Sequence, residues 1–215
     1  HKLNGKLLPR VASTKYLGVH FDENLSWASH IELITSKISK SAGIICRLKQ
    51  ILPNSVLHTL YNSLIQPYLN YCAIVWAANN SYKLNSILLI QKRIIRVINR
   101  SNRLAHAAPL FKKCGILVIN DIYKLQLAQF MFRFNHCMLP DCFSDFFVTN
   151  SSVHPYSTRQ NKNLHVYSVH TKLRQNNVKF AGPKLWNSLT ADEKSSVSLS
   201  TFTCRLKQKM LDKYI

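Results

Sequence analysis

Acidic residues are scarce in this 215-residue chain, which has nine Asp and Glu against 29 Lys and Arg. Metal-assisted phosphoryl transfer needs at least two convergent carboxylates, because only paired anions hold two divalent ions near each other. The adjacent acidic pairs, Asp22-Glu23 and Asp192-Glu193, have the sequence context of a turn and of a helix start. We therefore expect no catalytic residues and no two-metal site within this chain.

Other motifs that carry chemistry are missing as well. The five glycines are isolated, which excludes a phosphate-cradling glycine loop, and no serine lies in a GxSxG elbow. The six cysteines form no CxxC and no secretory signal opens the chain, so we expect reduced thiols in the nucleus or cytoplasm. No apolar run reaches the roughly 18 residues that a membrane span needs.

One group of residues has the elements of a zinc site. His136, Cys137, Cys142 and His154 are of the right types, and the spacing of the two cysteines is tolerable for a first ligand pair. Cys137, however, follows a helical stripe, which favours a buried thiol over a metal ligand. We expect no metal ion and no cofactor in this chain.

The excess of positive charge is the strongest indication of function. A net charge of +20 favours a polyanionic partner, most simply nucleic acid and less simply an anionic membrane surface. The plain alternative is a soluble basic domain without such a partner. Apolar residues make up 47% of the chain, which excludes a disordered polymer and indicates a packed core.

The first half of the chain begins with β-favouring residues and continues as helices. Tyr16, Leu17, Val19 and Phe21 form a short β-favouring run around Gly18, which predicts a strand, with Asp22-Glu23-Asn24 as the turn after it. Apolar residues at steps of three and four then predict a long helix that ends at Pro53. Ser29 and Glu32 have the spacing of a capping box at its start.

Three more helices are predicted before residue 136. The first starts at Ser55 and is interrupted by Pro67, because proline lacks the amide that a helix needs. The second runs from Tyr82 to Asn99, and the third runs from Ile122 to Asn135 with Asp121 as its cap. Antiparallel helices joined by short loops are the simplest arrangement for these stripes.

Beyond Pro140 the chain is polar and less regular. The alternation in Leu164 to Val169 predicts a strand, with Val178 to Phe180 as its partner, and a final helix is predicted from Ser200 to Tyr214. Gly182-Pro183 is interpreted as a corner, with Pro183 at the first position of a helix and Trp186 buried. The predicted fold class is therefore mainly α: a helical bundle with a short N-terminal β element and a small α+β C-terminal tail.

Basic side chains on two of the predicted helices are the candidate nucleic-acid-binding residues. Gln91, Lys92, Arg93, Arg96 and Arg100 are assigned to the face of their helix opposite the apolar stripe. The four cations among them repel one another in isolation, and neighbouring phosphates would relieve this repulsion. The plain alternative is that they are the solvated Lys and Arg that a helix of any basic protein carries. The full predicted set is Lys37, Lys40, Arg47, Lys49, Lys92, Arg93, Arg96 and Arg100.

Six segments resemble the reverse transcriptases of LINE-type (non-LTR) retrotransposons, particularly of the jockey and CR1 type. They are KYLGVHFDENLSWASHI, KISKSAGIICRLKQILP, LHTLYNSLIQPYLNYCAIVW, LLIQKRIIRVI, HPYSTR and AGPKLWNSL. The resemblance covers nearly the whole chain, in order and spacing. It implies the thumb and post-thumb region of a right-hand polymerase, whose palm would carry the paired aspartates and Mg²⁺ upstream of the matched segments.

The resemblance also implies a domain plan and a function. Residues 1–28 would be the remnant edge of the palm sheet, with Leu7 to Phe21 as its last strand. Residues 29–140 would be a thumb-like bundle, and 141–215 a C-terminal region. The implied function is a non-catalytic segment of an RNA-directed DNA polymerase that grips RNA and RNA–DNA hybrid through phosphate and sugar. Alone it is expected to be inactive, with the remainder of the polymerase as a further partner. The alternative is a helical protein–protein adaptor left after loss of the palm.

Overall fold

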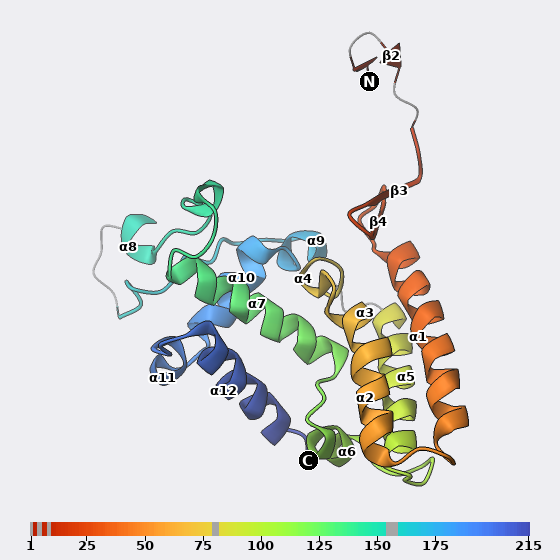
Figure 1. Ribbon diagram of the computed structural model, residues 1–215. Helices are drawn as coiled ribbons and strands as arrows, with labels where there is room; N and C mark the ends of the chain where they lie inside the picture. The colour runs from red at the N-terminus through yellow and green to blue at the C-terminus, as the bar shows by residue number, and fades with distance from the viewer. Residues whose placement is uncertain (1, 4–5, 8–9, 79–81, 154–158) are drawn as a thin grey trace.

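The computed structural model describes residues 2–3, 6–7, 10–78, 82–153 and 159–215 of the chain. These residues form twelve α-helices and one 3-10 helix, with short strands confined to the first 22 residues (Figure 1). The mainly α fold with a short N-terminal β element is therefore confirmed.

The N-terminal segment folds back on itself instead of forming one continuous edge strand. β1 (Lys2–Leu3) pairs with β2 (Lys6–Leu7), and β3 (Ser13–Tyr16) pairs antiparallel with β4 (Val19–Asp22). The β3–β4 hairpin turns at Leu17 and Gly18, whose φ angles of 45° and 80° suit a tight two-residue turn. Among the described residues, the outer edges of this hairpin have no strand partner.

A carboxylate in the loop organises the entry to the first helix. The predicted capping box is wrong, because Ser29 lies inside α1 (Ala28–Leu48) and the cap residue, Trp27, makes no side-chain cap bond. Asp22 accepts hydrogen bonds from the Asn24 and Ser26 amides and from the Ser26 hydroxyl. Burial raises the pKa of Asp22, but these hydrogen bonds outweigh it and hold the pKa below its usual value.

Five helices form the first layer of the bundle. They are α1 (Ala28–Leu48), α2 (Asn54–Leu64), α3 (Gln66–Asn70), α4 (Ala73–Trp76) and α5 (Tyr82–Ile98). The chain breaks next to Pro67 as predicted, and it breaks again at Cys72, which has a left-handed φ of 50°. Because α3 and α4 reverse the chain, α5 runs in the same direction as α1, and Lys83 near its start pairs with Glu32 near the start of α1.

The remaining helices follow a short connector. They are α6 (Ala107–Cys114), α7 (Ile119–Asn135), η1 (Asp141–Phe143), α8 (Asn150–Val153), α9 (Lys172–Gln175), α10 (Val178–Asn187), α11 (Ala191–Lys194) and α12 (Leu199–Asp212). α12 corresponds to the predicted final helix. Asp121 is not a cap but lies in the first turn of α7, where it accepts a hydrogen bond from the Tyr214 hydroxyl at 2.6 Å.

The two strands predicted in the C-terminal region are wrong. Leu164 makes a single isolated bridge to Thr149, and the Asn187 side chain bonds both the amide and the carbonyl of Leu164, at 3.1 and 2.8 Å. The side-chain amide therefore takes the place of a partner strand. Val178 to Phe180 is the first turn of α10, which is capped by the Asn177 side chain.

The predicted corner near residue 183 is half right. Trp186 is buried, as predicted, but Pro183 lies inside α10 and not at its first position. Gly182 is buried beside it, and a Cβ built there would lie 2.6 Å from Met131 Sδ. α10 therefore packs against α7 at very short range.

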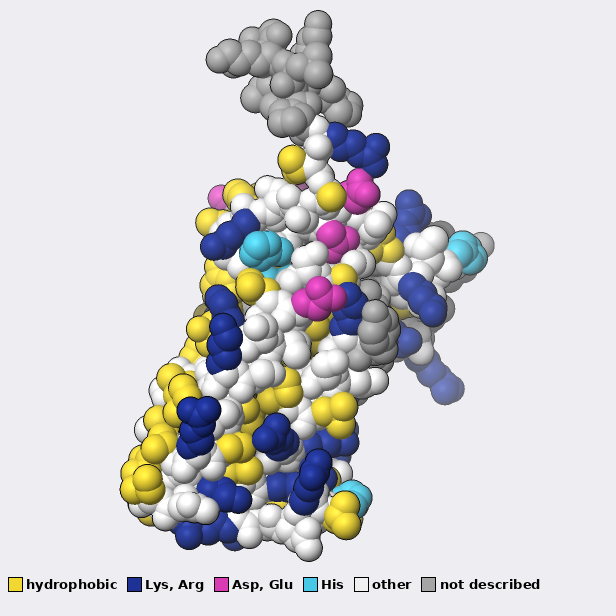
Figure 2. Space-filling model, turned by 90° about the vertical axis from the view of Figure 1, so that its right-hand side faces the viewer, with side chains coloured by type: hydrophobic (Ala, Val, Ile, Leu, Met, Phe, Trp, Pro, Cys, Tyr) yellow, Lys and Arg dark blue, Asp and Glu magenta, His cyan; other side chains and the backbone are white. Residues whose placement is uncertain are grey.

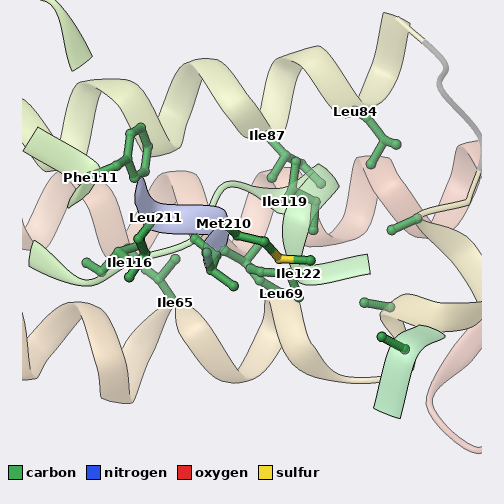
Figure 3. Close-up of a cluster of buried hydrophobic side chains, with 14 of the residues drawn as sticks. Ile65, Leu69, Leu84, Ile87, Phe111, Ile116, Ile119, Ile122, Met210 and Leu211 are labelled. Carbon is green, nitrogen blue, oxygen red and sulfur yellow. The ribbon is translucent and has the colours of Figure 1, made fainter. Parts of the chain in front are cut away.

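The hydrophobic core is continuous from α1 to α12. Figure 3 shows part of it, with Met210 and Leu211 among Ile65, Leu69, Phe111, Ile116, Ile119 and Ile122, and with Ile87 and Leu84 further along α5. The last helix thus buries its apolar side chains against residues that also line the interior of the bundle. Burial of this kind stabilises a fold by about 25 cal/mol per Å² of apolar surface.

A polar group lies at the centre of this core. Gln91 was assigned to the outer face of its helix, but its side chain is completely buried. Its Nε2 donates to the Tyr61 hydroxyl at 3.0 Å and to the Leu117 carbonyl at 3.2 Å, and its Oε1 accepts from the Ile119 amide at 2.9 Å. Gln91 therefore joins α2, α5 and the start of α7.

Candidate nucleic-acid interface

A cationic cleft lies where α1 and α5 end side by side. Its volume is about 790 Å³. It is lined by Cys46, Lys49, Gln50, Arg93, Arg96, Val97, Arg100, Ser101 and Arg103. Five of these nine residues are cationic, and none of the nine is acidic or aromatic. Because α1 and α5 run in the same direction, their carbonyl ends lie together, and the cations are placed at the partial negative charge of both helix dipoles.

The cleft contains four of the eight predicted binding residues: Lys49, Arg93, Arg96 and Arg100. The other four are Lys37, Lys40, Arg47 and Lys92. The first three are exposed elsewhere on α1, and Lys92 is half-buried on α5, outside the cleft lining. None of the eight side chains points into the packed interior, because none belongs to the buried core.

Two of the cleft arginines also hold the loops that surround them. Arg96 donates its Nε–H to the Ala105 carbonyl at 2.7 Å, and Arg100 donates to Asn54 Oδ1 at 3.0 Å and to the Leu52 carbonyl at 3.1 Å. These bonds satisfy carbonyl and amide oxygens beyond the helix ends. Arg96 and Arg100 therefore have a structural role that their spacing in the sequence does not reveal.

Three cleft cations are exposed and carry no such bond. Lys49, Arg93 and Arg103 have neither a hydrogen-bond nor an ion-pair partner among the residues that the structure describes. Arg103 was not predicted, because it lies in the connector after α5, where helical periodicity gives no information. Its three-residue spacing from Arg100 was the one available signal.

Acidic side chains on the α1 side of the molecule lie only near the hairpin. Figure 2 views this side and shows Lys and Arg along its whole height, whereas Asp and Glu are drawn only in the upper part, toward the hairpin. Five ion pairs join described residues, and none of them includes a predicted binding residue. The positive field around the cleft is therefore not neutralised by nearby carboxylates in the described part of the chain.

The next candidate site is the predicted group of zinc ligands. Cys137 and Cys142 are both exposed, so the interpretation of Cys137 as a buried thiol is wrong. His136 stacks on Phe132 and bonds its carbonyl, whereas His154 lies outside the described residues. Within the described ranges, no three His, Cys, Asp or Glu side chains gather as metal ligands would.

Two further observations bear on the partner. Tyr61 and Trp76 are buried in the core and cannot stack on bases, whereas Tyr68 and Tyr71 are exposed, outside the cleft lining. None of the described helices has both the length and the apolar character needed to cross a membrane.

Comparison with known proteins shows a distant relationship. Neither a family model nor a solved structure matches the chain. Among curated proteins, it is similar to the retrovirus-related Pol polyprotein from type-1 retrotransposable element R1 4 of Nasonia vitripennis, with 24% identity over 135 residues. The similarity covers 61% of this chain and 34% of that polyprotein, so the matched part is about a third of the relative. It supports a retrotransposon-related origin.

Proposed function

We propose that this chain is a non-catalytic, thumb-like segment of a retrotransposon RNA-directed DNA polymerase, and that it binds RNA and RNA–DNA hybrid. The observation that carries the proposal is the cleft at the ends of α1 and α5, with five cations and no carboxylate among its nine lining residues. The similarity to a retrotransposon Pol polyprotein supports the same assignment.

Phosphate is the ligand that this arrangement suits best. Lys49, Arg93 and Arg103 are exposed cations without a protein partner in the described chain, so a bound phosphate would relieve their mutual repulsion. Displacement of counterions from a nucleic acid then adds a favourable, salt-dependent free energy of binding. With no aromatic side chain in the cleft, contacts to phosphate and sugar dominate and sequence is not read.

A second set of cations extends along the outside of α1. Lys37, Lys40 and Arg47 are exposed and span ten residues, which corresponds to about 15 Å of helix. A raised helix face with cations at this spacing fits the phosphates along one strand of a duplex. We propose that an RNA–DNA hybrid lies across this face.

The β3–β4 hairpin supports the proposed connection to a polymerase palm. The outer edge of β3 has no strand partner in the described part of the chain, and all four β3 residues are exposed, whereas the His20 amide of β4 bonds His30 Nδ1 at 3.4 Å. Free strand edges of this kind pair readily with further strands. We propose that the remainder of the polymerase extends this sheet.

Binding and extension assays with the purified chain test the proposal. A fluorescent RNA–DNA hybrid of about 20 base pairs should bind at low salt, because several phosphates meet the basic surface. The same chain, given a primed RNA template, nucleotides and Mg²⁺, should not extend the primer. Absence of hybrid binding at low salt would favour the protein–protein adaptor, and primer extension would contradict the non-catalytic assignment.

A further inference from the structure

We infer that the cleft at the ends of α1 and α5 holds a single-stranded RNA backbone, separate from a duplex on the outer face of α1. The inference rests on the proposed function and divides its basic surface into two binding sites. It begins from shape, because the cleft is a hollow of about 790 Å³ whereas Lys40 and Arg47 are exposed on the outside of α1, with Lys37 beside them next to the Tyr68 ring. A rigid duplex cannot bend into such a hollow, but a flexible single strand can.

The two hydrogen-bonded cations of the cleft are already oriented. The Arg96 guanidinium uses its Nε and one Nη1 hydrogen for the Ala105 and Lys92 carbonyls, and Arg100 uses its Nε and one Nη2 hydrogen for Asn54 and Leu52. A guanidinium has five N–H donors, so each of these arginines keeps three for a ligand. Since their side chains are fixed before binding, little conformational entropy is lost when phosphate arrives.

The three cleft cations that have no partner in the described chain complete the set. Lys49 comes from the end of α1, Arg93 from the last turns of α5, and Arg103 from the connector beyond it, so they approach the cleft from three segments. Phosphates of a curved strand can each meet a different one of these cations. A straight phosphate row along a duplex would meet fewer of them.

The neutral residues of the cleft favour RNA. Gln50 and Ser101 line it and can donate to or accept from a ribose hydroxyl, which RNA has and DNA lacks. Val97 and Cys46 are the apolar part of the lining, and neither can stack on a base. We therefore expect binding that prefers RNA to DNA and depends little on base sequence.

The cleft is also far from the hairpin. α1 has 21 residues between its start next to β4 and its end at the cleft, which is about 30 Å of helix. A nucleic-acid strand bound in the cleft would therefore be well separated from one that is held near the hairpin. The α1 cations lie between these two ends, from Lys37 near the middle of the helix to Arg47 beside the cleft, so a duplex on α1 would continue into a single-stranded flank in the cleft.

Two triple variants of the full chain distinguish the two sites. K49Q/R93Q/R103Q removes three exposed cleft cations, and K37Q/K40Q/R47Q removes three exposed cations from α1, so the charge loss is matched. The probes are an unstructured single-stranded RNA of about ten nucleotides, its DNA counterpart, and an RNA–DNA hybrid. Thermal unfolding of each variant confirms that it is folded.

The cleft variant should weaken binding of the single-stranded RNA by about tenfold and lower its salt slope by about two, because each lost phosphate contact removes about 0.7 from the slope. Its affinity for the hybrid should change less than threefold. The α1 variant should instead weaken binding of the hybrid by about tenfold and change binding of the single-stranded RNA by less than threefold.

If the hybrid binds but each variant weakens binding of the single-stranded RNA and of the hybrid equally, the two-site inference is wrong while the proposed function stands. Displacement of the RNA by poly-glutamate at equal charge concentration would also overturn it. No binding of any nucleic acid would defeat the proposed function itself.

Discussion

The Arg100 guanidinium donates its Nε–H to Asn54 Oδ1 at 3.0 Å and thereby joins the end of α5 to the first residue of α2. Arg100 also has a left-handed backbone, with φ of 53°. A residue that spacing alone predicts as a phosphate ligand is thus part of the frame of the cleft. Replacing Arg93, Arg96 and Arg100 together would mix loss of binding with loss of stability, so Lys49, Arg93 and Arg103 make the cleaner test.

The backbone of Arg100 gives a prediction about stability. R100A removes the hydrogen bonds and keeps a left-handed alanine, whereas R100G removes the same bonds and relieves a strain of roughly 1–2 kcal/mol. R100G should therefore be more stable than R100A by about 1 kcal/mol in urea unfolding. Equal stability of the two variants would show that this backbone conformation is not strained.

Buried Gln91 gives a second prediction. Q91L removes the partner of the Tyr61 hydroxyl, the Leu117 carbonyl and the Ile119 amide in the core, and should lower the free energy of unfolding by about 2–4 kcal/mol. Y61F removes one of these partners and should lower it by about 1 kcal/mol. Urea titrations measure both, and a Q91L variant as stable as the parent chain would argue against the buried network.

Two helical glycines give opposite expectations. G182A places a Cβ against Met131 Sδ and Phe147, and we expect a net loss of about 1 kcal/mol, because overpacking exceeds the gain in helix propensity. G43A, in α1, places its Cβ where no described atom lies within 4 Å, and should gain about 0.5–1 kcal/mol. Thermal unfolding of the two variants should show shifts of opposite sign, and a stabilised G182A would contradict the close packing of α10 on α7.

His30 gives a prediction about pH. Burial, with smaller contributions from nearby His20 and Lys37, lowers the pKa of His30 from 6.5 to about 4. Between these values the unfolded chain binds a proton that the folded chain does not, so stability should fall as the pH is lowered from 6.5 to 4.

The control for this prediction is H30Q, which cannot titrate. The difference in unfolding free energy between pH 7 and pH 5 should be smaller for H30Q than for the parent chain. An identical difference would show that other groups cause the pH dependence.

The helices could be predicted from the sequence where apolar spacing decides the structure. Gln91 shows the limit, because it falls on the apolar stripe of α5 between Ile87 and Ile94, yet its polar side chain suggested an outer position. The false strand at Leu164 failed for a related reason. Its backbone is bonded by the side chain of Asn187, 23 residues away, and alternation of residue types does not contain that information.

The candidate site was predicted in part. The row of cations on α5 followed from helical spacing, but the approach of Lys49 to Arg93 depends on α1 and α5 running in the same direction. The chain turns back between α2 and α5, where it breaks next to Pro67 and at Cys72, and tertiary packing decides that turn. Arg103 lies in the irregular connector after α5, so neither helical nor strand periodicity could predict its place in the cleft.

The most direct test of the account is the salt dependence of hybrid binding by the unmodified chain. If the basic surface meets about four to eight phosphates, log K should fall linearly with log salt concentration, with a slope of about −4 to −7. A slope near zero, or no binding at 50 mM salt, would contradict the claim that this cationic bundle grips nucleic acid.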